Sequence, residues 1–329
     1  MINNFTKGLL VASMATFSIA THAQETLRLG HYFPAEDFRG KTAQFFADAV
    51  DKELLNVQVF PSESLVKGRD GFMGTARGSV DIYSLFGGYT VGNVGLMNIF
   101  TIPFPPEDFT DTNVLEFAND PRTLEILSEE FEKSNVKLLG FINSSGQTTI
   151  FLADSIDSLE DISTKRIRGV GGYTDPALED LEASVVFMSA AEQFLQLQTG
   201  GVDGVITTDS SYVNLGLSEV APVVIDGSIV KTPYPLIMNK RKWDALSEKQ
   251  QMNIESAVAE TITWSRNNFE EESQRLSSRI NEEAGEIYQL TESEVATVNE
   301  IRNRYLTEFS NEYGNKGEAL VDIYKEYIE

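Results

Sequence analysis

The residue types that most often perform catalysis are scarce in this 329-residue chain. It contains no cysteine, and of its two histidines only His31 lies outside the N-terminal segment described below. A zinc site or a Ser-His-Asp triad would have to use His31. Ser64 and Lys67 have Ser-x-x-Lys spacing without an accompanying Lys-Thr-Gly, and Gly40-Lys41-Thr42 lacks the first glycine of a phosphate loop. We therefore expect no catalytic residues, no metal and no cofactor.

The first 23 residues show the features of a secretory signal peptide in their usual order. Lys7 precedes an apolar and small-residue run over 8–20, and Thr21-His22-Ala23 supplies a small-x-small end. The run is shorter than the about 20 residues that a membrane span requires. We predict cleavage after Ala23, with a buried N-terminal helix as the alternative. Without a cysteine to carry a lipid, the mature protein is expected to be free in the periplasm.

The charge balance limits the possible partners. Acidic residues outnumber basic ones by 50 to 26, which gives a formal net charge of −24. So negative a chain is a poor partner for nucleic acid or for an anionic membrane surface. The acidity is interpreted first as a solvated outer surface that maintains solubility. Attraction of a cationic ligand is the second interpretation.

A binding site needs a scaffold, and the chain after residue 24 has an α/β pattern. Strands are predicted at 26–30, 57–60 and 80–85, and helices at 42–54 and 69–77. Such alternation is typical of a mostly parallel sheet with helices on its faces.

A second run of the same kind follows. Strands are predicted at 148–152, 165–170, 185–186 and 204–207. Ser189 and Glu192 have the spacing of a capping box, which predicts that a helix begins there. Two domains of similar construction are therefore expected.

The last part of the chain is predicted to be helical. From residue 246 onward, apolar residues including Ile254, Ile280 and Ile287 keep helical spacing among many charged and polar residues. This pattern predicts a long amphipathic helix. A coiled-coil dimer arm is the alternative, although the seam lacks a strict heptad.

One stretch resembles the most recognisable part of the DctP-type solute-binding proteins of TRAP (tripartite ATP-independent periplasmic) transporters. Ser158–Ile162 is similar to the family's Leu-x-Asp-Leu helix, and Ile167-Arg168 to its strand ending in Arg. Glu182–Val186 is similar to the next strand, and Leu195–Gly204 to the Leu-Gln-x-Gly-x-Val-Asp-Gly element. The resemblance covers the whole mature chain and includes flanking elements: Phe60-Pro61, Arg69, and Met238-Asn239-Lys240 with Trp243.

The resemblance implies an α/β fold of the two-domain Venus-flytrap type, with a long helix spanning both domains. We place domain I at 24–143 plus 233–272, and domain II at 144–232 plus 273–329. A monomer is expected that captures a small organic acid in the interdomain cleft and delivers it to a TRAP permease, without inserting in the membrane. The alternatives are a ligand-sensing subunit of a membrane signalling protein and, less favoured, a metal-independent lyase or hydrolase.

The family places an arginine on the ligand's carboxylate, and Arg168 holds that position here. A guanidinium matches a carboxylate as a planar fork of donors and stays charged when it is desolvated. A structural salt bridge is the alternative role. Many members carry a second arginine near the position of Gly146, which this chain lacks, and Thr207 replaces a common asparagine. Gln147 and Thr207 are expected to bond a neutral part of the ligand.

The other wall of the cleft is expected to be aromatic. By motif position, the candidates from domain I are Tyr32, Phe33, Lys67, Arg69, Phe86 and Tyr89. Further candidates at the opposite wall and hinge are Tyr173, Tyr212 and Tyr234. About half of the domain I candidates are expected to touch ligand, and the others to pack in the core. An aromatic wall fits a monocarboxylate with an apolar or aromatic body.

Overall fold

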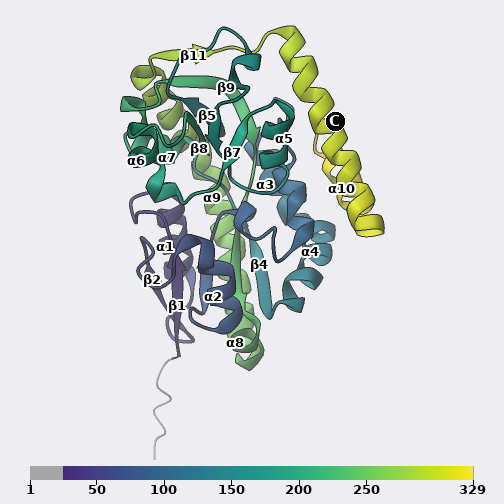
Figure 1. The fold of residues 1–329 in the computed structure, drawn as a ribbon. Coiled ribbons are helices and arrows are strands. Elements are labelled where there is room, and N and C mark those ends of the chain that lie inside the picture. The colour runs from purple at the N-terminus through teal and green to yellow at the C-terminus, as the bar shows by residue number, and fades with distance from the viewer. Residues whose placement is uncertain (1–24, 329) are drawn as a thin grey trace, which may run out of the picture.

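The first of two β-sheets lies in the N-terminal lobe of the computed structural model, which describes residues 25–328 (Figure 1). Its strand order is β2-β1-β3-β10-β4, in which β1 is parallel to β2 and β3 while β10 is antiparallel to β3 and β4. The strands are β1 (Thr26–His31), β2 (Asn56–Phe60), β3 (Ile82–Ser84), β4 (Val136–Ile142) and β10 (Tyr234–Asn239). The carboxyl ends of β1, β3 and β4 therefore meet at one edge. The predicted signal peptide lies outside the described residues.

Helices cover both faces of this sheet. They are α1 (Phe38–Ala49), α2 (Gly71–Arg77), α3 (Asp111–Asn119), α4 (Pro121–Lys133) and α8 (Lys240–Ala245). Successive residues of a strand point to opposite faces, and Ile82 and Tyr83 accordingly join different buried clusters. Ile82 packs with Phe46 of α1, and Tyr83 belongs to the cluster that contains Phe131 of α4. Each large apolar side chain buried in this way contributes about 1.5–3 kcal/mol.

The helix predicted at 42–54 is displaced in the structure. It begins at Phe38, because the carboxylate of Asp37 accepts the backbone N–H of Arg39 and caps the first turn. It ends at Ala49. This cap places Asp37 and Arg39 just beyond the carboxyl end of β1, where both later contribute to the site.

The second sheet has the strand order β11-β9-β5-β8-β6-β7. Its strands are β5 (Thr148–Leu152), β6 (Arg166–Arg168), β7 (Ser184–Val186), β8 (Gly204–Thr208), β9 (Val223–Val230) and β11 (Glu286–Tyr288). The helices beside it are α5 (Thr174–Asp180), α6 (Gln193–Gln198) and α7 (Asp209–Asn214). The predicted capping box is confirmed, since the carboxylate of Glu192 accepts the backbone N–H of Ser189 at 2.8 Å.

Two short connections carry the chain between the sheets, at residues 143–147 and 231–233, and a long helical segment, residues 240–285, makes the third crossing. The second joins β9 and β10, two strands that the sequence pattern did not predict. Pro235 lies within β10, where a proline argues against a strand. In β9 the pairing with β5 shifts, so that residues 226–228 leave the ladder. The lobes thus exchange strands across a hinge.

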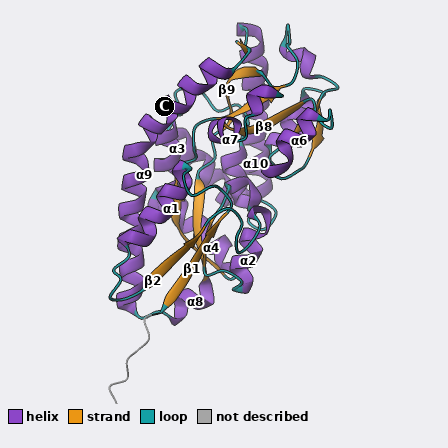
Figure 2. Ribbon diagram, turned by 90° about the vertical axis from the view of Figure 1, so that its left-hand side faces the viewer, coloured by secondary structure: helices purple, strands orange, loops and turns teal. Residues whose placement is uncertain are grey.

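A long helix, α9 (Glu248–Glu283, 36 residues), extends along both lobes. At 1.5 Å per residue it is about 54 Å long. It contacts α1 and β4 of the first lobe and α7 of the second, and Figure 2 shows it running beside both sheets. The implied lobe-spanning helix is confirmed.

The predicted helical stripe does not continue through Ile287. α9 ends at Glu283, and Ile287 lies in β11, which pairs with β9. The chain then forms α10 (Glu292–Glu326), which contacts α4 and the 3-10 helix Gly95–Thr101 of the first lobe. The domain boundaries given above stay a prediction. No helix within residues 25–328 is long and apolar enough to cross a membrane.

Candidate ligand-binding site

A small cavity lies where the strand ends of the two sheets face each other. From the first lobe it is lined by Tyr32, Phe86, Tyr89 and Tyr234, and from the second by Thr148, Arg168, Val170, Ala190, Thr207, Thr208 and Ser211. The carboxyl edge of parallel strands is the usual ligand position in open α/β sheets. Its volume of about 20 Å³ is close to that of one water molecule. The walls must therefore move apart to admit an organic acid.

Arg168 is the single charged residue that lines this cavity among the residues that the structure describes. It ends β6 and is 3% exposed. Its Nε donates to the carbonyl of Met188 at 3.3 Å, and its Nη1 to the carbonyl of Ile206 at 2.5 Å. Within residues 25–328, Nη2 has no hydrogen-bond partner, and the salt bridge considered as its alternative role is not formed. A buried guanidinium without a carboxylate is costly, so this site favours an anion.

Asp175 is an acid whose charge interacts with that of Arg168. Its Oδ1 accepts the backbone N–H groups of Val170 and Gly171, both at 2.9 Å. Burial raises the pKa of Asp175, while these bonds and the charge of Arg168 oppose the shift. Asp175 is thus held by the backbone and leaves the donors of Arg168 available.

The wall from the first lobe is an interlocked aromatic group. The ring centroid of Phe86 lies 5.5 Å from that of Tyr89 and 5.8 Å from that of Tyr234, in edge-on geometry. The hydroxyls of Tyr32 and Tyr234 are 3.1 Å apart. Burial raises the pKa of Tyr32 well above its usual value, so its hydroxyl stays protonated. The wall therefore combines apolar ring edges with neutral hydroxyls.

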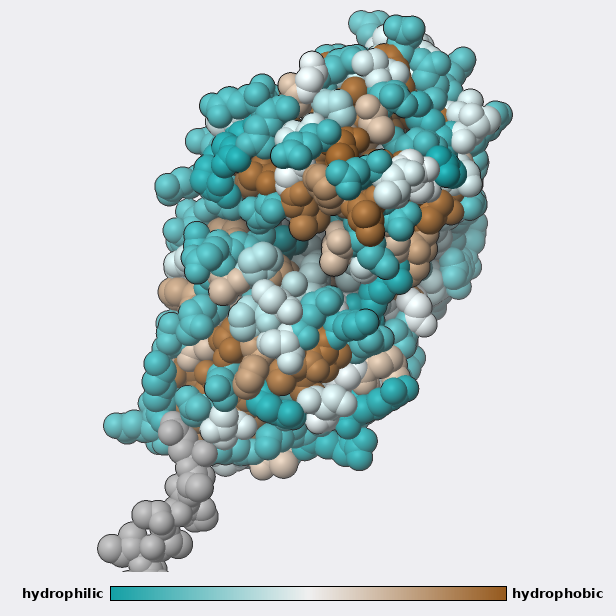
Figure 3. Space-filling view, turned by 60° about the vertical axis from the view of Figure 1, so that its left-hand side comes forward, coloured by the Kyte–Doolittle hydropathy of each residue, from teal (hydrophilic) through white to brown (hydrophobic). Residues whose placement is uncertain are grey.

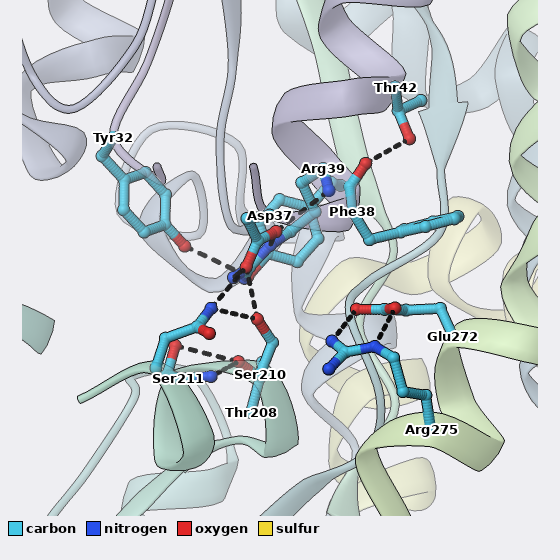
Figure 4. Close-up of polar contacts among 12 residues, drawn as sticks. Tyr32, Asp37, Phe38, Arg39, Thr42, Thr208, Ser210, Ser211, Glu272 and Arg275 are labelled. Carbon is cyan, nitrogen blue, oxygen red and sulfur yellow. Dashed lines mark hydrogen bonds and ion pairs between the residues drawn. The ribbon is translucent and has the colours of Figure 1, made fainter. Parts of the chain in front are cut away.

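Behind this wall lies a buried ion pair between Asp37 and Arg39 (Figure 4). Nε and Nη2 of Arg39 donate to the two carboxylate oxygens of Asp37, each at 2.8 Å, and Nη1 donates to the hydroxyl of Tyr234 at 2.7 Å. Burial opposes ionisation of Asp37, but Arg39 outweighs it and the pKa of Asp37 lies below its usual value. The charge of Arg39 is thus neutralised within the first lobe.

The same carboxylate links the two lobes. Ser210 and Asn214, both on α7, donate to Oδ2 of Asp37, the latter at 3.4 Å. Asp37 therefore joins the N-terminal end of α1 to the second lobe. These bonds exist only while the lobes are together, so they help to stabilise the closed arrangement.

Six of the twelve predicted site residues line the cavity: Arg168, Thr207, Tyr32, Phe86, Tyr89 and Tyr234. Phe33 lies behind them, 2% exposed, with its ring stacked on His31 at 4.3 Å. Tyr212 lies in the core of the second lobe, stacked on Phe151 at 4.0 Å, and its hydroxyl donates to the carbonyl of Ala221.

Gln147 lines a different cavity of about 690 Å³ behind the hinge. Its side-chain oxygen accepts the hydroxyl of Ser228 at 3.3 Å. The cations of that cavity, Lys231 and Arg302, donate to backbone carbonyls at 2.5 and 2.9 Å. Although it is larger, this cavity has acidic lining residues, and both of its cations already donate to backbone carbonyls. The cavity at Arg168 is therefore the candidate ligand site.

Three predicted residues lie at the surface around the lobes. Lys67 and Arg69 are exposed, and the Arg69 guanidinium stacks over the ring of Phe187 in the other lobe, 3.7 Å from its centroid. The hydroxyl of Tyr173 donates to Glu312 on α10 at 2.6 Å. Arg69 and Phe187 thus form a contact across the lobes rather than a ligand contact.

The sequence did not single out Asp37, Arg39, Thr148, Thr208 or Ser211. Thr148 and Thr208 are opposite each other in the β5–β8 pair, so one face of the sheet brings both to the cavity. The Asp-x-Arg spacing of Asp37 and Arg39 is a readable helix-start signal. Their contact with Tyr234, 195 residues further along the chain, is not readable from local sequence.

His31 does not form the catalytic arrangement considered from the sequence. It is 1% exposed, and neither ring nitrogen has a hydrogen-bond partner among the described residues. Burial lowers its pKa to about 4, so the ring is neutral at physiological pH. In this position it serves as a stacking partner of Phe33.

Two α/β lobes that exchange strands and enclose a cleft define a solute-binding protein of the Venus-flytrap type. Residues 29–312 match the model of the DctP family, bacterial extracellular solute-binding protein family 7. The chain belongs to this family, and the resemblance read from the block around Arg168 is confirmed.

Similar proteins agree with this assignment. A solute-binding protein of Albidiferax ferrireducens is 26% identical, covering 77% of each chain. A Bordetella pertussis extracytoplasmic receptor binding pyroglutamic acid has a TM-score of 0.82 at 17% identity, covering 91% of this chain and 99% of that one. A TRAP protein from Desulfovibrio salexigens with bound orotic acid has a TM-score of 0.83 at 18% identity, covering 93% and 99%. At these identities the structural likeness establishes the fold.

Proposed function

We propose that this protein captures a small monocarboxylate between its lobes and delivers it to the permease of a TRAP transporter. The observation that carries the proposal is Arg168, a buried guanidinium with unused donors at the meeting point of the two sheets. We further propose that it works as a monomer in the periplasm, after removal of residues 1–23.

The cavity favours one carboxylate over two and disfavours a cation. Arg168 is the one guanidinium in its lining, and Arg39 behind the wall is already paired with Asp37. A second carboxylate would lie against tyrosine and phenylalanine rings without a counter-charge, which is costly. No acidic residue is among the described lining residues, so a cationic ligand would meet only the repulsion of Arg168.

Two of the structural neighbours support this class of ligand, although others hold dicarboxylates such as malonate and malate. The Bordetella pertussis receptor binds pyroglutamic acid, and the Desulfovibrio salexigens protein holds orotic acid. Each of these compounds carries a single carboxyl group on a ring. Both fit the combination of one guanidinium and an aromatic wall.

Capture and delivery follow from closure of the lobes. The carboxylate first binds Arg168 on the second lobe, and the aromatic wall of the first lobe then covers it. The ligand stabilises the closed state only through contacts that it makes better there. The bonds from Ser210 and Asn214 to Asp37 add to the same state. The permease is expected to recognise this closed form.

Calorimetric titration with matched acids tests the proposal. Pyroglutamate and orotate are compared with malate, malonate and small amines on the purified mature protein. Arg168→Gln should weaken binding of a monocarboxylate at least about thirtyfold, since loss of a buried charge partner costs about 2 kcal/mol or more. The matched control is Arg166→Gln on the same strand, where an exposed arginine pairs with Asp203. Its effect should stay below about threefold.

Two results would contradict the proposal. One is binding of amines or neutral sugars in preference to every acid. The other is unchanged affinity in Arg168→Gln at an unchanged melting temperature. Delivery is tested by uptake of the labelled acid into vesicles that carry the permease, which should depend on the wild-type receptor and fail with Arg168→Gln.

A further inference from the structure

A chain of hydrogen bonds reaches the cavity from the side opposite Arg168. Nη1 of Arg39 donates to the hydroxyl of Tyr234 at 2.7 Å, and that hydroxyl lies 3.1 Å from the hydroxyl of Tyr32. Tyr32 and Tyr234 both line the cavity, while Arg39 lies behind them and is 2% exposed. Figure 4 shows Tyr32 and Arg39 converging from the loop and helix that follow β1. The protons of these two hydroxyls determine which hydrogen bonds the wall can make to a ligand.

The count of free protons is the same whichever tyrosine donates to the other. Arg39 can only donate, so it occupies one lone pair of the Tyr234 oxygen. If Tyr234 then donates to Tyr32, the proton of Tyr32 is free; if Tyr32 donates to Tyr234, the proton of Tyr234 is free. Neither hydroxyl has another partner among the described residues. In both cases the pair presents one spare hydrogen-bond donor to the cavity.

The ion pair behind the wall fixes this arrangement. Two nitrogens of Arg39 are bonded to Asp37, and the guanidinium lies over the ring of Tyr234, 5.1 Å from its centroid. The remaining nitrogen therefore points at Tyr234 and cannot act as an acceptor. Because Asp37 cancels the charge of Arg39, the wall supplies a donor without supplying a second positive charge.

The geometry points to a ligand that carries a neutral acceptor oxygen, such as a ketone or lactam carbonyl, opposite its carboxylate. This inference rests on the proposed capture of a monocarboxylate at Arg168 and narrows the chemical class of that ligand. A plain alkyl acid would leave the spare phenolic proton buried without a partner, and such an unpaired donor lowers affinity by about tenfold or more. The ligand is thus an oxo or lactam acid rather than a simple fatty or aromatic acid.

Matched pairs of acids test this inference because each pair differs by one acceptor. Suitable pairs are 3-oxocyclopentanecarboxylate with cyclopentanecarboxylate, 4-oxopentanoate with 4-methylpentanoate, and 2-oxobutanoate with 2-methylbutanoate. They span several distances between carboxylate and carbonyl. In at least one pair, the wild-type protein should bind the carbonyl acid at least about tenfold more tightly.

The preference should depend on the two hydroxyls together. Either tyrosine alone still presents a proton, so single Tyr→Phe variants should retain part of the preference. The double variant Tyr32→Phe/Tyr234→Phe should bring the ratio within each pair close to one. The control is Tyr212→Phe, which removes a hydroxyl from the core of the second lobe, outside the cavity. It should leave the ratio unchanged.

The outcomes separate this inference from the proposed function. If acids bind but no pair shows a preference in the wild type, the acceptor inference is overturned and the carboxylate site stands. Persistence of the full preference in the double variant would also overturn it. If no acid binds at all, the proposed function falls, and this inference falls with it. The wild-type ratios decide the matter even if the double variant fails to fold.

Discussion

The ion pair of Asp37 and Arg39 gives a prediction about stability that follows directly from burial. The two side chains are 0% and 3% exposed, respectively, and share two bonds of 2.8 Å. Asp37→Asn keeps the shape of the side chain but leaves Arg39 as an unpaired buried cation. Breaking a buried pair in this way costs about 3–5 kcal/mol. This is a large part of the about 5–15 kcal/mol that stabilises a typical protein.

The measurement is urea unfolding followed by circular dichroism, with a thermal melt in parallel. A loss of 3–5 kcal/mol should lower the melting temperature by about 6–15 °C. The control is Asp48→Asn, which changes an acid of the same helix that is 57% exposed, pairs with Lys52 and accepts a hydrogen bond from Gln44. Its effect should stay within about 0.5 kcal/mol.

A second substitution separates the effect of the unpaired charge on stability from the effect of packing. If the loss comes from the uncompensated guanidinium, then Asp37→Asn/Arg39→Met should recover part of it, because the buried charge is then gone. The reasoning is refuted if Asp37→Asn unfolds at the same urea concentration as wild type. It is also refuted if the double variant loses more free energy of unfolding than Asp37→Asn and Arg39→Met lose together.

Two further predictions concern the hinge and the contact between the lobes. Beside the hinge, burial raises the pKa of Asp209 to about 7, so the folded state retains a proton that the unfolded chain loses near pH 4. The free energy of unfolding should therefore fall as pH rises from about 4 to 7. In urea titrations at several pH values, Asp209→Asn should flatten that slope. Phe187→Ala removes the ring under the Arg69 guanidinium, which lies 3.7 Å from the ring centroid, so ligand release measured by stopped flow should become about two- to fivefold faster. The control is Leu195→Ala, which changes another exposed apolar residue of the same lobe and should leave the release rate unchanged.

The local sequence pattern was sufficient to predict several strands of the two sheets. The strands predicted at 26–30, 57–60 and 204–207 are β1, β2 and β8, with ends within one residue. Their apolar runs are short and bounded by glycine, proline or polar residues, which makes them readable. β9 and β10 were not readable, because Pro235 and the Asp226-Gly227-Ser228 segment interrupt the pattern. Their place in the sheets depends on pairing with β5 and β4, which no local signal encodes.

The residues of the candidate site were predictable where a sequence motif identified the end of a strand. Arg168 is the last residue of β6 and Thr207 the penultimate residue of β8, and the strand direction brings both to the cavity. Gln147 lies outside this cavity for the complementary reason: neighbouring residues of an extended chain point to opposite sides, and Thr148 is the one that faces the cavity. In α7 the helical turn of 3.6 residues sends successive side chains in different directions, so Ser211 lines the cavity while Tyr212 packs in the core.

The negative charge of the chain and the positive charge of its site have a common explanation. The formal net charge is −24, yet the described lining residues include one arginine and no acid. Figure 3 shows hydrophilic residues over much of one face, with hydrophobic patches on both lobes. Acids on the surface are screened by salt over about 8–10 Å, whereas a buried guanidinium is screened much less. The surface charge therefore acts weakly inside the cleft, where Arg168 is the one charged residue among the described lining residues.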